Sequence, residues 1–198
     1  MDQHARLIIL DRDGVLNHTV PNPKEARPDS PLRVEEVTVF SGVPALLRQL
    51  TEAGFVLAVA TNQPAYAKGK TSLEALQQVQ ERVLQEVQGE GGVISSSHVC
   101  LHRAEDGCDC RKPKPGLLNA ALARHPTVLR QQSWMVGDRA TDVLAGAAAG
   151  VQTALLGDAL GAERRALGLA GAVGPSFCGN DLQDFVRFLL ASEAQGKY

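Results

Sequence analysis

Short apolar runs alternate with amphipathic segments along most of the chain, and this alternation constrains the fold more than any other feature. Several of the runs are almost continuously apolar, as strands buried on both faces require. They lie at residues 7–10, 55–60, 93–100, 134–136 and 151–156. Between them, residues 43–53 and 72–88 carry apolar side chains at the three- and four-residue spacing of a helix. Strand and helix repeated in this way predict an α/β fold, a doubly wound parallel sheet with helices on both faces.

The ends of these helices carry recognisable signals. Thr71 is placed to cap the second helix, with Glu74 as its reciprocal partner, and Gly54 stands where a left-handed residue would end the first. Three further helices are marked by Pro115, by residues 146–150 and by residues 181–190. Residues 18–40 fit the scheme poorly, because their prolines prevent a regular helix and only residues 34–40 alternate like a strand. We expect this segment to be an irregular excursion close to the site.

Length and charge restrict the class of protein. A chain of 198 residues predicts one domain, residues 1–198. The 20 basic against 22 acidic residues, with 4% aromatic residues, argue against a general binder of nucleic acid or anionic membranes. No stretch has the length and apolarity of a membrane span, and the polar start lacks the pattern of a signal peptide. We therefore expect a cytoplasmic monomer whose partner is a small molecule.

Carboxylates follow two of the predicted strands. Ligands of such sheets bind beyond the carboxyl ends of the strands, and Asp11 and Asp13 follow the first run while Asp138 follows the fourth. Asp11 could act as a nucleophile or metal ligand, and Asp13 could donate a proton to a leaving group. Asp138 could complete an oxygen site for Mg²⁺. Asp-x-Asp-Gly alone is also common in turns and calcium loops, so the joint placement carries the prediction.

Two further groups suit phosphate chemistry. Thr61 offers a hydroxyl and neighbouring backbone amides, and Lys112 offers a cation. Phosphoryl transfer depends mainly on positioning and neutralising charged oxygens. The combination of carboxylates, hydroxyl and cation therefore predicts an enzyme of phosphoryl transfer.

Cysteine and histidine cluster between residues 100 and 110. Cys100-x-His102 and Cys108-x-Cys110 supply four ligands suited to tetrahedral Zn²⁺. His98 shares the strand face and competes for the ion, but Cys110 makes the better fourth ligand; free thiols in a loop are the alternative. Four protein ligands leave no open position, which predicts a structural zinc loop at residues 100–110.

Four strings together resemble the haloacid dehalogenase superfamily, and within it the D-glycero-D-manno-heptose 1,7-bisphosphate 7-phosphatases and the related histidinol-phosphate phosphatases. The resemblance spans residues 7–156 and rests on LDRDGVLN (10–17), ATNQ (60–63), CRKPKPG (110–116) and MVGDR (135–139). It implies a Rossmann-like sheet in which the short zinc loop stands in place of a large cap domain.

The same resemblance implies a role for each matching residue. Asp11 attacks phosphorus and becomes an aspartyl phosphate, while Asp13 protonates the departing sugar oxygen and then activates water. Mg²⁺ sits between Asp11, the backbone carbonyl of Asp13, and Asp138. Asp142 either orients Lys112 or is a helix N-terminal charge. The substrate is contacted by Thr61, Asn62, Gln63, Arg111 and Lys112, with Thr61 and Lys112 on the phosphoryl group and Arg111 on the rest.

Several functions are compatible with these motifs. A magnesium-dependent phosphatase of heptose 1,7-bisphosphate, acting at position 7, is the first, and histidinol-phosphate phosphatase is the second. Arg111 and Lys114 favour a substrate with a second phosphate, whereas residues 64–66 and 18–40 depart from the heptose enzymes and should line the pocket. A polynucleotide 3′-phosphatase would need a basic groove with aromatics, and a non-catalytic zinc module would not need the intact carboxylates. Outside the site, we expect Trp134 and Cys178 to be packed.

Overall fold

The computed structural model describes residues 6–22, 28–157, 160–172 and 174–194. Within these ranges, six parallel strands form one sheet in the order β3-β2-β1-β4-β5-β6. The strands are β1 (Arg6–Leu10), β2 (Phe55–Asn62), β3 (Ile94–Cys100), β4 (Trp134–Gly137), β5 (Gln152–Leu156) and β6 (Phe177–Gly179). The chain winds outward from β1 to β3 and, in the opposite direction, from β4 to β6. The predicted doubly wound sheet is thereby confirmed, with its switch point between β1 and β4.

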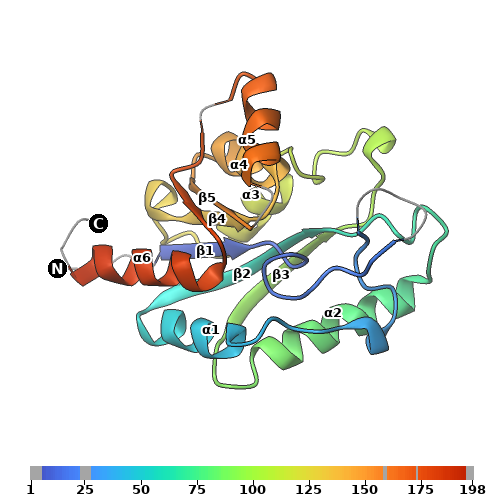
Figure 1. Cartoon of the computed structure of the whole chain (residues 1–198), viewed down its shortest axis with the longest axis horizontal. Coiled ribbons are helices and arrows are strands. Elements are labelled where there is room, and N and C mark those ends of the chain that lie inside the picture. The colour runs from blue at the N-terminus through green and yellow to red at the C-terminus, as the bar shows by residue number, and fades with distance from the viewer. Residues whose placement is uncertain (1–5, 23–27, 158–159, 173, 195–198) are drawn as a thin grey trace.

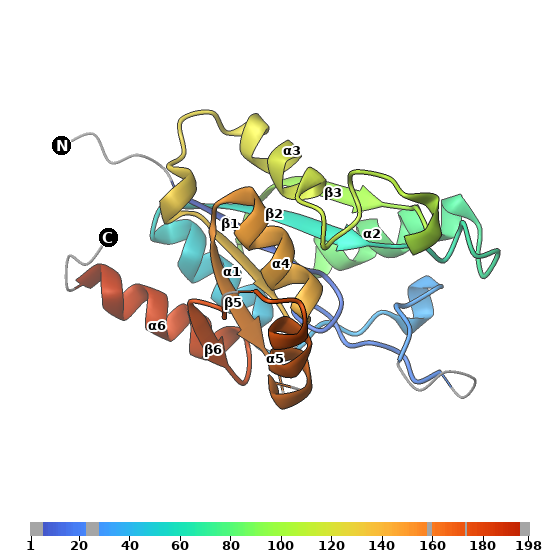
Figure 2. The ribbon, with the colours of Figure 1, turned by 90° about the horizontal axis from the view of Figure 1, so that it is seen from above.

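Helices cover both faces of this sheet (Figures 1 and 2). They are α1 (Val43–Glu52), α2 (Leu73–Val87), α3 (Gly116–Arg124), α4 (Ala140–Ala149), α5 (Leu160–Leu169) and α6 (Leu182–Ala194). Successive residues of a strand point to opposite faces, so Ile8 packs with α1, α2 and α6, whereas Ile9 packs with α3 and α4. No described helix has the length and apolarity needed to cross a bilayer.

Two of the predicted helix ends can be compared with the structure. Gly54 follows α1 with a φ of +82°, which confirms the left-handed end. The predicted cap of α2 is wrong by one residue: Ser72 Oγ accepts the hydrogen bond from the backbone N–H of Ala75 at 3.1 Å. The Thr71 hydroxyl instead donates to the carbonyl of Leu32 at 3.2 Å. It thereby ties the excursion after β1 to the start of α2.

That excursion is irregular over its described residues, as predicted, although residues 34–40 alternate like a strand. Residues 34–40 do not form a strand; Val34–Glu36 is a 3-10 helix. The Glu36 carboxylate accepts from the backbone N–H of Leu32 at 2.9 Å and from the Arg33 side chain, which closes a turn where a strand would extend. Within the described residues, neither this segment nor the loop at 100–110 builds a large cap, as expected. Residues 23–27 of the excursion lie outside the description.

The burial of Trp134 and Cys178 can be compared with the prediction that both side chains are packed. Trp134 is in the core, with its ring centroid 5.2 Å from that of Phe185. Cys178 was expected to be packed, but it is exposed on the edge strand β6, where one of its two alternating faces meets solvent. The short β6 and the helix α5 carry weak periodic signals and were not predicted.

Close packing of α4 on the sheet predicts the effect of adding one methyl group. A Cβ at Gly146 would lie 2.5 Å from Thr153 Cγ2 and 3.0 Å from Met135 Cβ. Gly146→Ala should lower the free energy of unfolding by about 1–3 kcal/mol, because the helix must move off β4 and β5. Urea denaturation followed by circular dichroism measures this change.

The matched control is Gly168→Ala in α5, where an added Cβ meets nothing within 4 Å. It should raise the free energy of unfolding by about 0.5–1 kcal/mol through helix propensity alone. Equal effects of the two substitutions would contradict the packing argument.

Candidate functional site

Three carboxylates converge at the switch point of the sheet. Asp11 follows β1 and Asp138 follows β4, while Asp142 lies in the first turn of α4. One oxygen from each of the three lies within 4.8 Å of the others. Gly14 makes this approach possible: its φ is +85°, and a Cβ there would lie 2.3 Å from Asp138 Oδ2. Only glycine fits between the β1 loop and this carboxylate.

Burial makes these carboxylates costly to ionise together. It raises the pKa of Asp138 to about 8, with a further contribution from Asp11, and raises that of Asp11 to about 6 against the attraction of Lys112. Asp138 Oδ1 is buried and receives no hydrogen bond from the described residues. A small divalent cation with oxygen preference would satisfy this atom and neutralise its neighbours. The donor set therefore fits Mg²⁺.

Lys112 places one cation among these acids. Its side chain is 2% exposed, and Nζ lies 2.9 Å from Asp11 Oδ1 and 2.7 Å from Asp142 Oδ1. Although burial alone would lower it, the two carboxylates raise the pKa of Lys112 above its ordinary value. Asn62 holds the lysine backbone from both sides, accepting from its N–H at 3.1 Å and donating to its carbonyl at 3.0 Å. Asn62 was predicted to contact substrate; in the structure its amide fixes Lys112.

Asp13 lies in a different environment from Asp11. Arg12 donates to both of its oxygens, with Nη2 at 3.1 Å from Oδ1 and 3.0 Å from Oδ2. Asn17 and Gln63 donate to it as well, at 2.9 Å and 2.6 Å. Burial alone would raise the pKa of Asp13, but pairing with Arg12 and these hydrogen bonds hold it below its usual value. The Asp13 side chain is not part of the carboxylate group, so its predicted contact with Mg²⁺ stays one through the backbone carbonyl.

Two other predicted substrate residues lie beside Asp13. Gln63 Nε2 donates to Thr61 Oγ1 at 2.9 Å as well as to Asp13, so this amide bridges the two side chains. Both Gln63 and Thr61 are buried. Gln63 is therefore placed to orient its neighbours, and Thr61 lies at the end of β2 as predicted.

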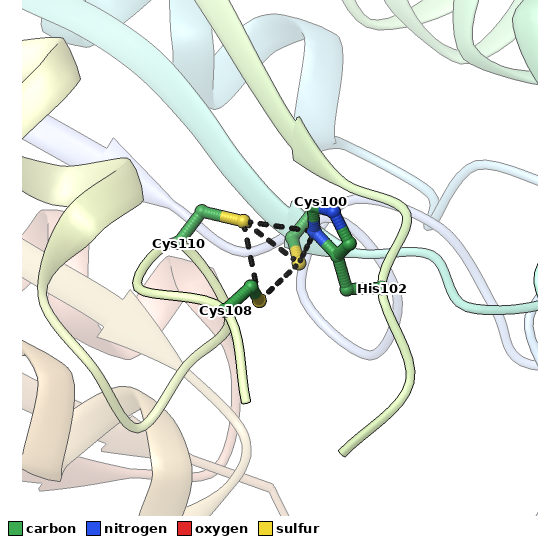
Figure 3. A group of neighbouring side chains, drawn as sticks. All are labelled: Cys100, His102, Cys108 and Cys110. Carbon is green, nitrogen blue, oxygen red and sulfur yellow. Dashed lines mark hydrogen bonds between the residues drawn. The ribbon is translucent and has the colours of Figure 1, made fainter. Parts of the chain in front are cut away.

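The four predicted zinc ligands point toward one another (Figure 3). Cys110 Sγ lies 3.2 Å from Cys100 Sγ, 3.5 Å from Cys108 Sγ and 3.3 Å from His102 Nδ1. Tetrahedral zinc with bonds of about 2.3 Å to sulfur separates its ligands by roughly 3.8 Å, and disulfides are far shorter. His98, the competitor, instead contacts Ser96 at 3.1 Å. The geometry therefore fits one metal ion held by the four predicted residues.

The cations that follow this cluster are held by the loop itself. Arg111 Nη1 donates to the carbonyl of His102 at 3.1 Å, and Lys114 Nζ donates to the carbonyl of Gly107 at 2.9 Å. Arg111 was predicted to contact the rest of the substrate, and in the structure its guanidinium braces the loop. A metal ion at the cluster would thus fix the segment that continues into Lys112.

Two residues of the site were not foreseen. Arg12 lies between Asp11 and Asp13 in the chain, and the alternation of a strand does not predict what its side chain contacts. Gln80 hydrogen-bonds to Arg12 from α2, but the apolar periodicity of that helix identifies only its buried face. Arg139 immediately precedes α4, and its backbone N–H donates to Asp142 Oδ2 at 3.1 Å. Asp142 combines both of its predicted roles, since it lies in the first turn and pairs with Lys112.

Removal of the buried cation tests this arrangement. Lys112→Met leaves buried carboxylates without their counter-charge and should lower the free energy of unfolding by about 3–5 kcal/mol in the metal-free protein. Urea denaturation in chelator measures the loss. Lys114→Met is the matched control, because that side chain is 48% exposed and pairs with a fully exposed aspartate; it should change stability by less than about 1 kcal/mol. Equal losses would show that Lys112 does not neutralise the group.

Comparison with known proteins places the chain among characterised enzymes. A family model described as "HAD-hyrolase-like" matches residues 109–185. The D-glycero-beta-D-manno-heptose-1,7-bisphosphate 7-phosphatase of Pseudomonas putida is 37% identical over 154 residues, which are 76% of this chain and 82% of that protein. The histidine biosynthesis bifunctional protein HisB of Legionella pneumophila is 34% identical over 137 residues, covering 69% of this chain but 37% of that protein.

A solved structure agrees with these relatives. The D,D-heptose 1,7-bisphosphate phosphatase from B. bronchiseptica, complexed with magnesium and phosphate, superposes with a TM-score of 0.79 at 29% identity, covering 94% of this chain and 99% of that one. The similarity extends over both halves of the sheet and therefore over every element that carries the carboxylate group. The chain belongs to the HAD-like hydrolases, in the family of the D-glycero-beta-D-manno-heptose-1,7-bisphosphate 7-phosphatases.

Proposed function

We propose that this protein is a magnesium-dependent phosphomonoesterase that removes the 7-phosphate of D-glycero-D-manno-heptose 1,7-bisphosphate. The observation that carries the proposal is the buried group of Asp11, Asp138 and Asp142 around Lys112 at the switch point. The names of the relatives support the substrate, and the magnesium and phosphate in the related crystal structure support the metal and the reaction.

Mg²⁺ would be held by Asp11, Asp138 and the backbone carbonyl of Asp13, with Asp142 behind them. When bound, the ion neutralises phosphate oxygens and favours charge build-up during transfer. Lys112 acts on the same charge: its ammonium lies against Asp11 and balances part of the negative charge of an approaching phosphate. Thr61 is placed to hold a phosphoryl oxygen through its hydroxyl.

Asp11 and Asp13 divide the reaction in two. In the first step a carboxylate oxygen of Asp11 attacks phosphorus, the bond from phosphorus to the sugar oxygen breaks, and Asp13 gives its proton to that oxygen. In the second step water attacks the aspartyl phosphate and gives a proton to Asp13, so phosphate leaves and Asp11 is restored. The first step needs Asp13 protonated and the second needs it ionised. The donors around its carboxylate favour the ionised form, which is the form that the second step needs.

Histidinol phosphate is the second candidate substrate, and the HisB relatives support it. Heptose 1,7-bisphosphate carries a second phosphate, whereas histidinol phosphate carries a cationic amine. Arg111 and Lys114 both lie on the loop that leads to Lys112, and their positive charge favours the bisphosphate. A polynucleotide substrate is disfavoured by the balanced charge and the 4% aromatic content.

We also propose that the Cys/His cluster holds a structural Zn²⁺. Three thiols and one imidazole match its preferences, and the four ligand atoms leave no position for substrate. Cys100, Cys108 and Cys110 form a metal-ligand group and no disulfide, a use of cysteine typical of a reducing compartment, which supports a cytoplasmic location. We further propose that the partner is a small phosphorylated metabolite, as the names of the relatives support, and that the chain acts as a monomer without nucleic acid or membrane.

A substrate panel tests the proposed activity. With Mg²⁺ present, phosphate release should be fastest from one anomer of heptose 1,7-bisphosphate, slower from histidinol phosphate, and slowest from a 3′-phosphorylated oligonucleotide. Measurement of kcat/KM for each compound ranks them. Faster release from histidinol phosphate would transfer the assignment to the second candidate.

Asp11→Asn serves as the control for that panel. It replaces the attacking carboxylate by an amide and should abolish release from every compound, since the aspartyl phosphate can no longer form at this position. Persistent release by this variant would point to a different mechanism.

Zinc content tests the structural site. Purified protein should contain one zinc ion per chain by plasma mass spectrometry, and Cys108→Ser should lose most of it, because one of four ligands is removed. The kcat should fall with it, since the loop that carries Lys112 is no longer fixed. Cys178→Ser, at an exposed cysteine outside the cluster, should keep the full zinc content. Zinc retained by Cys108→Ser would contradict the assignment.

A further inference from the structure

Among the residues that the structure describes, Arg12 is the completely buried cation whose role the reaction leaves open. Its residue exposure is 0%, and it lies between the two catalytic aspartates in the chain. Its guanidinium donates from Nε and Nη2 to the Asp13 carboxylate, at 3.2 Å and 3.0 Å. A two-point contact of this kind sets the plane of the carboxylate as well as its position. Arg12 therefore controls where the Asp13 oxygens point.

The opposite edge of the guanidinium is held by one residue of α2. Arg12 Nη1 donates to Gln80 Oε1 at 3.0 Å, and Gln80 Nε2 donates in turn to Ser97 Oγ on β3 at 3.0 Å. A chain of hydrogen bonds thus runs from the site to the edge strand of the sheet. Gln80 is its central member and the contact that the structure provides for Nη1.

The surroundings of Arg12 explain why such a brace is needed. A cavity of about 280 Å³ lies beside the guanidinium, with walls that are mostly apolar; it is lined by Arg12, Gln63, Leu73, Leu76, Gln80 and Val99, among others. Glu81 also lines this cavity. Without Gln80, the guanidinium would have space to move and a second carboxylate to move toward. The hydrogen bond that Gln80 Oε1 accepts keeps the guanidinium turned to Asp13.

We propose that Arg12 and Gln80 are positioning residues for the proton transfer: Gln80 holds the guanidinium, and the guanidinium holds the Asp13 carboxylate in line with the leaving oxygen. The proposal rests on the proposed role of Asp13. The Gln80 side chain hydrogen-bonds to Arg12 and Ser97 and to neither catalytic aspartate, so its proposed effect on the reaction passes through Arg12.

Two substrates with different leaving groups distinguish this positioning role from a general loss of rigidity in the site. A sugar alkoxide must receive a proton as it departs, whereas p-nitrophenolate is a stable anion and leaves without one. The ratio kcat/KM reports only steps up to the first irreversible transfer, which is the step in which Asp13 acts as acid. Misplacement of Asp13 should therefore slow the sugar phosphate more than p-nitrophenyl phosphate.

Substitutions at Gln80 provide the test, because this residue is only half-buried on α2. Gln80→Met keeps the length but removes the acceptor, and should lower kcat/KM for heptose 1,7-bisphosphate by about tenfold. For p-nitrophenyl phosphate the loss should stay below about twofold. Gln80→Glu restores an acceptor for Nη1 and should recover most of the lost rate. Gln85→Met, at an exposed glutamine of the same helix, should match the wild type on both substrates.

Two results would overturn the proposal: an equal loss on both substrates, or no loss with Gln80→Met. Failure of the proposed function looks different, since it appears in the wild type. If wild-type enzyme hydrolyses histidinol phosphate and not the heptose bisphosphate, the same comparison is made with histidinol phosphate, which also has an alkoxide leaving group. Thermal unfolding of Gln80→Met and Gln85→Met, followed by circular dichroism, shows that both variants are folded under the assay conditions.

Discussion

The buried ammonium of Lys112 makes the rest of the site possible. Three carboxylates within 4.8 Å of one another repel strongly once water is removed, and Lys112 is the cation that contacts two of them directly. Several separate features serve to bring it there. Asn62 clamps its backbone, the Cys/His loop leads into it, and α4 carries Asp142 to it. These elements come from distant parts of the chain, so the site forms only when both halves of the sheet are assembled.

This close approach of the carboxylates depends on glycines, which have no side chain, as well as on the charged residues. Gly14 lets the loop after β1 pass Asp138, and a Cβ at Gly137 would lie 2.3 Å from Asp142 Oδ2. Gly146 brings α4 against β4 and β5. The site lies in the crevice at the switch point of the doubly wound sheet, and these glycines leave room there for the backbone beside the carboxylates. The result is a compact metal site on a rigid base, which phosphoryl transfer requires.

Asp11 and Asp13 are two residues apart and chemically distinct. Burial raises the pKa of Asp11 to about 6, whereas the donors around Asp13, with Arg12 foremost, hold its pKa below the usual value. The two side chains point to different cations: Asp11 faces Lys112, and Asp13 faces Arg12.

The order of apolar runs and the polar residues after each strand were sufficient to predict the sheet, the carboxylate edge and the Cys/His cluster, because these depend on local periodicity and on short ligand spacings. The cap of α2 was predicted one residue too early, because the Thr71 hydroxyl donates to the carbonyl of Leu32, which no local pattern relates to it. Asn62 and Gln63 were named for substrate, yet their amides hold Lys112 and Asp13. The primary structure alone determined the carboxylates, Lys112 and the Cys/His ligands as groups of the site. Only the tertiary structure decided which of them face one another, because the contacts of Arg12 with Gln80, and of Lys112 with Asp142, join segments that no sequence spacing relates.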